Sequence, residues 1–305
     1  MNEAIAIDPK IVIAPEAYME ALETFDAAVC EACAVSQAIG RRMAEPYAGY
    51  AAIFFARICA HATPMIRALP HTRWVKSDFD HWDFGAIAGH VRAIAEGHLT
   101  FMYLAETPES REQWSTKLNV MHLSDCSRRI TMFRNLDDED QVKGLEEQRK
   151  ELQDRLNNNV HFQTLPEATR KQCLNGKFLT IINRDELIKS VGWDAKQFNA
   201  YFDLLSQHTH ILTMSFYRME PNGRGTGIEN ETDRGYMTAA MVFCTSVIQN
   251  EIERLVELFP DVAPSRQGIN SKFSPGPVAN LPDWRLAQVA PKQVQVKKRK
   301  SKFRK

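Results

Sequence analysis

Apolar side chains recur at steps of three and four residues along most of this 305-residue chain, a spacing that leaves little room for any structure other than α-helix. Such steps bring side chains to one face of a helix, whereas a half-buried strand needs strict alternation. The clearest stripe consists of Phe84, Ile87, Ala88, Val91, Ile94, Ala95, His98 and Met102. We find no convincing alternating run. The sequence therefore predicts an all-α fold, a helical bundle of roughly eight helices.

The ends of these helices are marked by prolines and by capping residues. Pro64 and Pro70 are expected to break the second helix, and Pro221 is expected to stop the helix that begins at residue 195. Asn183 and Asp194 each precede a Glu or Gln by three residues, the spacing of a capping box at a helix start. The expected helical stretches are 16–42, 47–61, 84–106, 112–136, 141–158, 195–219 and 236–259.

Charge and proline content divide the chain into segments. Residues 292–305 carry eight of the 38 Lys and Arg side chains and no acid, which leaves 30 cations against 38 acids in the acidic body before them. Five prolines lie between residues 261 and 291, where no helical period continues. The expected segments are an N-terminal extension (1–13), one main helical domain (14–259), a proline-rich linker or strap (260–291) and a basic tail (292–305).

Two segments within the main domain are expected to be exposed. The charged arm at 137–160 has only a thin apolar seam, so it is either an exposed arm or one half of a helical hairpin. Gly223, Gly225 and Gly227 predict a mobile loop over residues 222–235.

The chain has no feature that predicts insertion into a membrane. It contains no run of 18 apolar residues, and its N-terminal MNEAIAIDPK has acids where a secretory signal has cations. Six cysteines in 305 residues fit a reducing compartment, so we expect a cytoplasmic protein. Cys30 and Cys33 have the spacing of half a zinc site, but no second half accompanies them. We therefore expect no metal and no cofactor.

Arg92 and Glu96 lie four residues apart, beside the apolar stripe of the 84–106 helix. At that spacing the two side chains can form an ion pair at the edge of the stripe. One interpretation is a half-buried structural salt bridge. The other is a guanidinium at a polar seam between helices, where it would bind a phosphate or stabilise an anionic transition state.

The 195–219 helix carries a polar stripe that includes Asp203, Ser206 and His210. His210 can reach Ser206 on that stripe, but a nucleophilic serine would also need an oxyanion pocket, which the sequence does not reveal. His208 falls on the apolar side and is expected to be a buried, hydrogen-bonded histidine. The residues from which we expect an active centre to be built are Arg92, Glu96, Asp203, Ser206 and His210.

Arg92 and Glu96, followed by Tyr201-x-x-Leu-Leu-Ser206-x-x-x-His210, resemble a family of uncharacterised bacterial helical proteins. More distantly, they resemble the HEPN superfamily of helical ribonucleases, toxins and antiphage effectors, over about residues 84–259. The resemblance implies a metal-independent ribonuclease of toxin or antiphage type that acts as a homodimer. In that mechanism His210 would be the acid or base, Arg92 would stabilise the charged phosphorane, and Glu96 would orient Arg92.

HEPN ribonucleases carry an Arg and, a few residues later, a His, and they assemble this pair across a dimer to cleave RNA. Arg92 with His98 and Arg155 with His161 match that spacing. On an unbroken helix, however, a step of six residues separates Arg92 and His98 by about 120° around the axis.

A non-catalytic protein that binds nucleic acid or a partner is the alternative. Residues 186–205 contain a helix, a Gly-containing turn and a second helix, which is similar to a helix-turn-helix DNA reader. Lys196, Gln197 and Asn199 would open its recognition helix. Asp203 and the acidic body disfavour phosphate contacts, so a structural helix corner remains open as well.

The basic tail is the most specific electrostatic feature of the chain. Its cations, with Phe303 among them, would contact RNA, DNA or an anionic membrane in a salt-dependent way, and we expect RNA more than DNA. A solubilising end is the alternative. The cations expected to bind nucleic acid are Lys297, Lys298, Arg299, Lys300, Lys302, Arg304 and Lys305.

Overall fold

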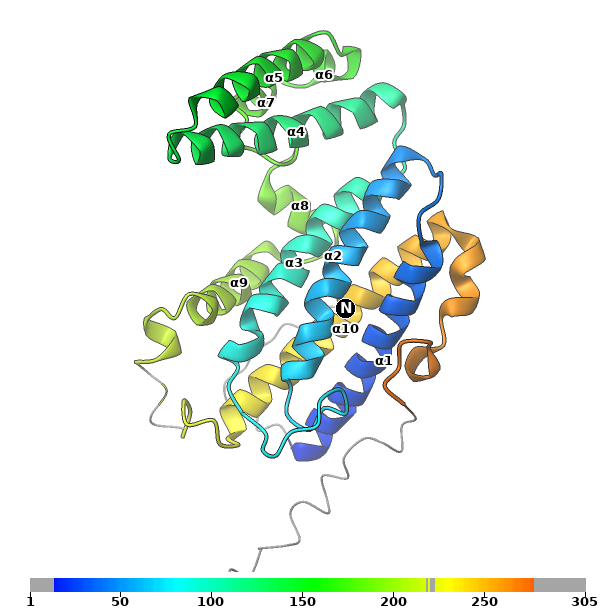
Figure 1. Cartoon of the computed structure of the whole chain (residues 1–305), viewed down its shortest axis with the longest axis vertical. Coiled ribbons are helices and arrows are strands. Elements are labelled where there is room, and N and C mark those ends of the chain that lie inside the picture. Colours follow the sequence, from blue (N-terminus) through cyan, green and yellow to red (C-terminus); the bar gives the residue numbers. More distant parts are fainter. Residues whose placement is uncertain (1–13, 218, 220–222, 277–305) are drawn as a thin grey trace, which may run out of the picture.

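The computed structural model describes residues 14–217, 219 and 223–276, and it confirms the all-α prediction. These residues form ten α-helices and no β-strand, and none of the helices is long and apolar enough to cross a bilayer. The α-helices are α1 (Pro15–Ile39), α2 (Pro46–Ala68), α3 (Gly85–Ala105), α4 (Arg111–Arg134), α5 (Glu139–Asn157), α6 (Val160–Thr164), α7 (Glu167–Leu174), α8 (Arg184–Ser190), α9 (Ala195–Thr209) and α10 (Glu231–Leu258) (Figure 1). Among the described residues, three 3-10 helices follow α9 and α10: η1 (Thr213–Ser215), η3 (Pro260–Ser265) and η4 (Gly268–Asn270).

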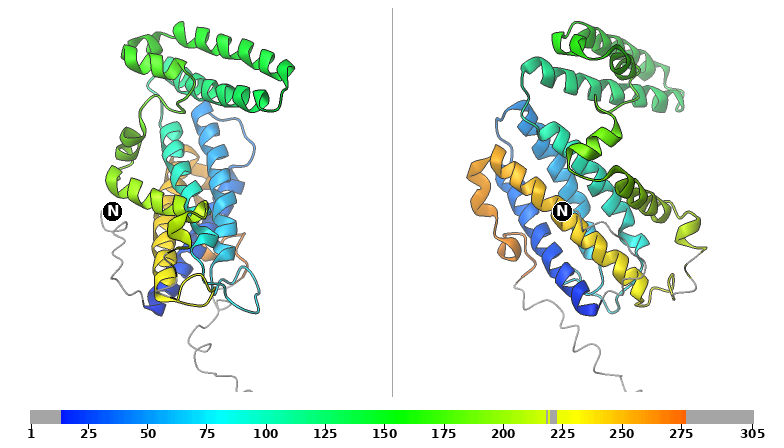
Figure 2. Two further views of the ribbon diagram at one scale, coloured as in Figure 1. Left: turned by 90° about the vertical axis from the view of Figure 1, so that its left-hand side faces the viewer. Right: turned by 180° about the vertical axis from the view of Figure 1, so that it is seen from behind.

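The larger core lies between α1, α2, α3, α9 and α10. The long helices α1, α2, α3 and α10 run side by side, and α9 packs against α3 (Figures 1 and 2). Fully buried aromatic side chains fill this core, among them Phe25, Phe55, Phe84, Phe101 and Phe198. Burial of each large apolar side chain stabilises the fold by about 1.5–3 kcal/mol. The stripe that predicts the 84–106 helix is therefore the side of α3 that enters this core.

A second, separate core lies between α4, α5, α6 and α7, which form a layer at one end of the long helices (Figure 1). The thin seam of the charged arm is buried there, because α5 folds back on α4. The arm is thus one half of a hairpin. The sequence predicts neither α6 nor α7, since helices of five and eight residues hold too little periodicity. The buried members of this core are Val120, Leu123, Cys126, Ile130, Val142, Leu145, Leu152, Leu156, Phe162 and Cys173.

The break expected at Pro64 is wrong, because α2 continues through this residue to Ala68. A proline inside a helix removes one hydrogen bond and costs about 3 kcal/mol. Met65 and Ile66, which directly follow it, are fully buried in the larger core. Burial of two such side chains stabilises the folded state by about 3–6 kcal/mol, so packing outweighs the local cost of the proline.

The glycine-rich segment before α10 is anchored to the body, whereas its glycines predict a mobile loop. Arg224 forms an ion pair with Asp233 at 2.9 Å, and both side chains are buried. The backbone N–H of Trp82 donates to the carbonyl of Gly227 at 2.9 Å. At Gly227 φ is +76°, and a Cβ there would collide with the ring of His81. Glycine is needed at this position because the ring of His81 lies close to the backbone, and not because the loop has to be flexible.

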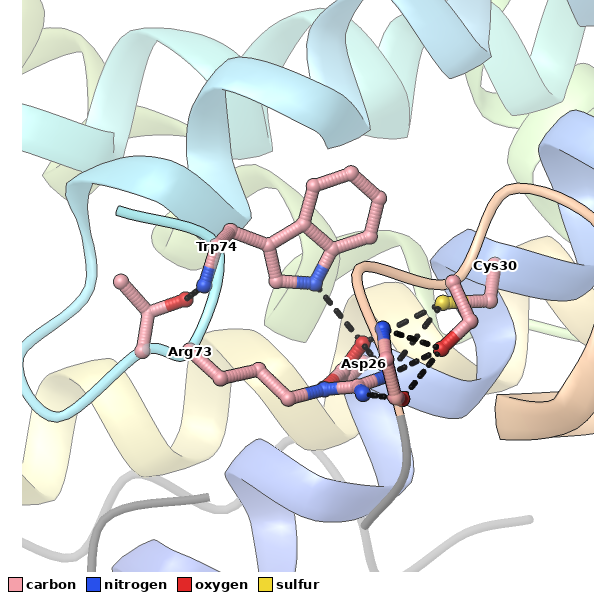
Figure 3. Close-up of polar contacts among 7 residues, drawn as sticks. Asp26, Cys30, Arg73 and Trp74 are labelled. Atoms are coloured by element: carbon pink, nitrogen blue, oxygen red, sulfur yellow. Dashed lines mark hydrogen bonds and ion pairs between the residues drawn. The ribbon is translucent and has the colours of Figure 1, made fainter. Parts of the chain in front are cut away.

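The described part of the proline-rich segment, residues 260–276, lies against the body. Both η3 and η4 pack on α1. The buried guanidinium of Arg73 donates to Ser274 Oγ at 2.8 Å and to the carbonyl of Gly276, and it also forms an ion pair with Asp26 (Figure 3). This portion is therefore a strap across α1, while residues 277–291 lie outside the described part of the chain.

His61 on α2 and His90 on α3 face each other, with their Nδ1 atoms 3.3 Å apart. Burial lowers the pKa of both imidazoles below 6.5, and the charge of Arg57 adds to the effect at His61. A histidine whose pKa is lower in the folded than in the unfolded chain resists protonation in the folded state, so acidification favours unfolding. Its contribution to the free energy of unfolding is fully present above the unfolded pKa and is lost as the pH falls through the folded pKa. We therefore expect the free energy of unfolding to decrease from about pH 7 to pH 5.

Urea denaturation at a series of pH values measures this dependence. The double variant His61→Gln/His90→Gln should lose stability less steeply with acidification and retain only the contribution of the other titrating groups. An identical slope in both proteins would contradict the prediction.

Candidate functional site

The candidate centre lies where α9 ends beside α3. Arg92 of α3 and His210, 118 positions apart in the sequence, meet there with Arg92 Nη1 3.2 Å from His210 Nε2. A guanidinium only donates hydrogen bonds, so Nε2 of His210 is the acceptor in this contact. The contact is exposed. The two residues named for acid–base and electrostatic roles therefore share one site that solvent can reach.

The positive charge of Arg92 is not matched by a carboxylate among the described residues. Its Nε atom is buried without a hydrogen-bond partner. Its guanidinium carbon lies 4.6 Å from the centroid of the Phe202 ring, a cation–π arrangement. A guanidinium with an unused donor and no counter-charge suits an anionic ligand.

Glu96 does not pair with Arg92, although their spacing predicts such a pair. Its Oε1 accepts from Arg184 Nη1 at 3.3 Å, and Arg184 begins α8. The guanidinium carbon of Arg184 lies 4.3 Å from the centroid of the Phe202 ring. The ring of Phe202 is therefore in cation–π contact with two guanidinium groups, those of Arg92 and Arg184. Because Glu96 neutralises Arg184, it does not orient Arg92 in this arrangement.

Ser206 and Asp203 do not complete the centre. The hydroxyl of Ser206 donates to the carbonyl of Phe202 at 2.8 Å, one turn back in the helix, instead of reaching the imidazole of His210. Asp203 is exposed, and no ion pair joins it to Arg92 within the described ranges. Of the five residues expected in the centre, Arg92 and His210 are the two that contact each other.

α9 ends at Thr209 and not at Met219 as its periodicity predicts. Ile211 adopts a left-handed conformation with φ +52°, and the N–H of Leu212 bonds to the carbonyl of Gln207 at 2.9 Å. This bond is the longer-range of the two hydrogen bonds of a Schellman cap, in which glycine usually occupies the left-handed position. Because isoleucine rarely occupies this position, the sequence does not reveal that the helix ends here. The turn makes His210 the C-cap residue of α9.

Replacing Ile211 by Gly should stabilise the protein by about 1 kcal/mol, because a β-branched residue in the left-handed region costs about 1–2 kcal/mol. The side chain is 74% exposed, so little burial is lost. Ile53 is a matched control, since it is 63% exposed within α2, where glycine should destabilise by about 1 kcal/mol. Urea denaturation compares the two variants. Destabilisation by both would contradict the strained cap.

Neither of the pairs with HEPN-like spacing forms a site. His98 is buried, and its Nδ1 atom lies 3.0 Å from Oε1 of Glu251 in the larger core, not near Arg92. Arg155 and His161 line different hollows in the surface. His208 is buried as expected, with its ring edge-on to Phe84.

The helix-turn-helix-like corner consists of α8 and α9. Both predicted starts are confirmed: Asn183 forms a complete capping box, and Asp194 accepts from the N–H of Gln197. Lys196, Gln197 and Asn199 are exposed in the first turns of α9. The basic tail and its cations from 297 to 305 lie outside the described residues.

The two cysteines of the CxxC spacing contact protein groups. The thiol of Cys30 donates to Asp26 Oδ1 at 3.3 Å, and burial raises its pKa to about 12. The sulfur of Cys33 lies 3.7 Å from Thr63 Oγ1. Over the ranges that the structure describes, no three metal-binding side chains gather.

Arg184 and Phe202 belong to the candidate site, but no pattern in the sequence assigns them to it. Phe202 falls on the apolar face of its helix and carries no further signal. Arg184 follows the capping residue Asn183, and its charge alone does not indicate where it points.

No family model, no curated protein and no solved structure matches this chain. The chemistry of the site therefore has to be inferred from its own geometry.

Proposed function

We propose that this protein is a HEPN-like ribonuclease of toxin or antiphage type that cleaves RNA without a metal ion. The observation that carries the proposal is the exposed contact between Arg92 Nη1 and His210 Nε2 at 3.2 Å. The pair combines a permanent positive charge with a side chain type that exchanges protons near neutral pH. Cleavage of RNA by its own 2′-hydroxyl needs both functions.

In the proposed reaction a base takes the proton of the 2′-hydroxyl, and the 2′-oxygen attacks the neighbouring phosphorus. The 5′-oxygen then leaves with a proton from an acid, and a cyclic phosphate remains. His210 serves as the base or the acid, and Arg92 donates to the charged phosphorane oxygens. When Arg92 turns to the phosphate, it releases Nε2 of His210, so substrate binding frees the imidazole. The second proton-transfer group would come from a second copy of the chain, as the HEPN resemblance implies.

The surface that follows His210 supports binding of an unpaired strand. Phe216 and Tyr217 are 56% and 74% exposed. The apolar side chains of Ile211, Leu212 and Met214, which precede them in the sequence, are exposed as well. Proteins bind single-stranded RNA largely by stacking its bases on aromatic side chains. These two rings lie within seven residues of His210 in the sequence, so they can hold bases next to the centre.

Incubation of purified protein with total RNA in the presence of a metal chelator tests the proposal. The wild type should degrade RNA, whereas Arg92→Ala and His210→Ala should both lose most of that activity. Equal degradation by all three proteins would eliminate this centre, and degradation that requires an added metal would contradict the metal-independent mechanism.

A non-catalytic binding protein is the second proposal, and the exposure of Lys196, Gln197 and Asn199 at the start of α9 favours it. RNA binding that survives Arg92→Ala and His210→Ala but is weakened by Lys196→Glu, or disappears when residues 292–305 are removed, would support it, provided that none of the proteins degrades RNA.

A further inference from the structure

A hollow of about 360 Å³ lies between α4, α5 and the turn that follows α7, in the layer that contains the second core. It belongs to neither the Arg92 centre nor the helix corner. The lining residues that matter here are Ser127, Arg128, Arg134, Arg149, Gly176 and Lys177.

Every charged side chain that lines this hollow is a cation, namely Arg128, Arg134, Arg149 and Lys177. Arg134 is paired with Glu146, while none of the other three has a carboxylate partner within the described part of the chain. Like charges around one concave surface repel each other, and an anion bound between them removes that repulsion.

Two other hollows in the same protein have carboxylates as well as cations in their linings. One is lined by Arg111 and Arg155 together with Glu112, Glu151 and Asp154. In the other, Lys117 donates to Glu106 at 2.5 Å. Of these three hollows, only the one between α4, α5 and the turn after α7 has a lining in which every charged side chain is a cation.

Two hydrogen-bond donors at this hollow have no partner. Nε of Arg149 and Oγ of Ser127 are both buried, and neither makes a hydrogen bond. Buried polar groups are nearly always hydrogen-bonded, so an unused pair at the wall of a hollow calls for an acceptor. An anion with several oxygens can accept from the guanidinium and ammonium groups at the rim, and a small shift of the Arg149 and Ser127 side chains would bring these two donors to it.

The walls are held in place by close packing. Gly176 has φ +66°, and a Cβ there would overlap with Oγ of Ser127, so the turn after α7 is pressed against α4. Gln153 Nε2 donates to the carbonyl of Leu174 at 3.0 Å and ties α5 to the end of α7. The cations are thus presented by elements that are already fixed to one another.

We propose that this hollow binds a phosphate dianion, either inorganic phosphate or the terminal phosphate of a phosphomonoester. A tetrahedral oxyanion matches the forked donors of arginine. Two negative charges complement several cations better than the single charge of a phosphodiester does.

Isothermal titration of the full-length chain with inorganic phosphate tests the site. We expect one saturable site, whose affinity falls at least about tenfold in Arg149→Gln, because a charge-assisted hydrogen bond is lost. Ser127→Ala should weaken binding by a smaller factor and alters the fold very little. Arg155→Gln is the matched control, since it removes the same charge from an exposed position on α5, outside the hollow, and should leave the affinity unchanged.

The same titration with a nucleoside 5′-monophosphate, the parent nucleoside and an RNA oligonucleotide without a terminal phosphate distinguishes the sources of the phosphate. Tighter binding of the monophosphate identifies a phosphomonoester, and equal binding identifies free phosphate; both support the proposal. It would be overturned if phosphate bound without saturation, if Arg149→Gln and Ser127→Ala bound it like the wild type, or if the oligonucleotide bound this site as tightly as the monophosphate.

Discussion

Replacing Asp26 by Asn is expected to lower the free energy of unfolding by about 3–5 kcal/mol, because it removes the carboxylate that balances a buried arginine. The side chains of Asp26 and Arg73 are each 1% exposed, and Oδ2 of Asp26 lies 2.5 Å from Nε of Arg73 (Figure 3). Oδ1 also accepts from Nε1 of Trp74 at 2.7 Å. Asparagine keeps an acceptor for the indole but not the negative charge.

Urea denaturation followed by far-UV circular dichroism measures the loss. Glu23→Gln is the matched control, because Glu23 is exposed on the same helix and its neutralisation should change stability by less than about 0.5 kcal/mol. A loss no larger than that of the control would show that the buried pair adds little.

The double variant Asp26→Leu/Arg73→Met separates the charge from the packing. Removal of both charges leaves no buried ion, so it should cost less than Asp26→Asn alone, despite losing more hydrogen bonds. Arg73 also holds Ser274 and Gly276 of the strap. The double variant should therefore make the strap more accessible to proteolysis while it preserves much of the stability of the helices.

The contact between Arg92 and His210 was within reach of sequence analysis, but only in part. In the sequence Arg92 lies beside the apolar stripe of one predicted helix and His210 on the polar stripe of another, and these positions identified them. The helix patterns contain no information on which helices become neighbours. That α9 packs against α3, and that Ile211 ends α9 with a left-handed residue, came from the structure alone.

The cationic hollow had no comparable signal in the sequence. Its lining comes from α4, α5 and the turn after α7, and α7 is too short to show a period. Arg149 lies in a highly charged helix, and nothing in the sequence distinguishes it from the other charged residues there. What distinguishes it is the burial of its Nε atom without a partner, a property that depends on three elements meeting.

Replacing His210 by Ala is expected to slow RNA cleavage by about 100- to 10,000-fold, the contribution of a positioned acid or base. Arg92→Ala should cost about 100- to 1,000-fold, because it removes a donor aimed at the charged phosphorane. Single-turnover cleavage of a defined oligonucleotide measures both rates. His161→Ala is the control, since His161 lines a hollow apart from the centre and should leave the rate unchanged.

The double variant Arg92→Ala/His210→Ala shows whether the two residues act on the same phosphate. Groups that work as a unit are not additive, so removing both should slow cleavage little more than removing the more important one. Losses that multiply would instead mean independent contributions, and the 3.2 Å contact between Nη1 and Nε2 would then have no part in the reaction. Arg92→Lys refines the result: it keeps the charge but loses the planar fork, so a rate between those of the wild type and Arg92→Ala would assign part of the effect to geometry and the rest to charge.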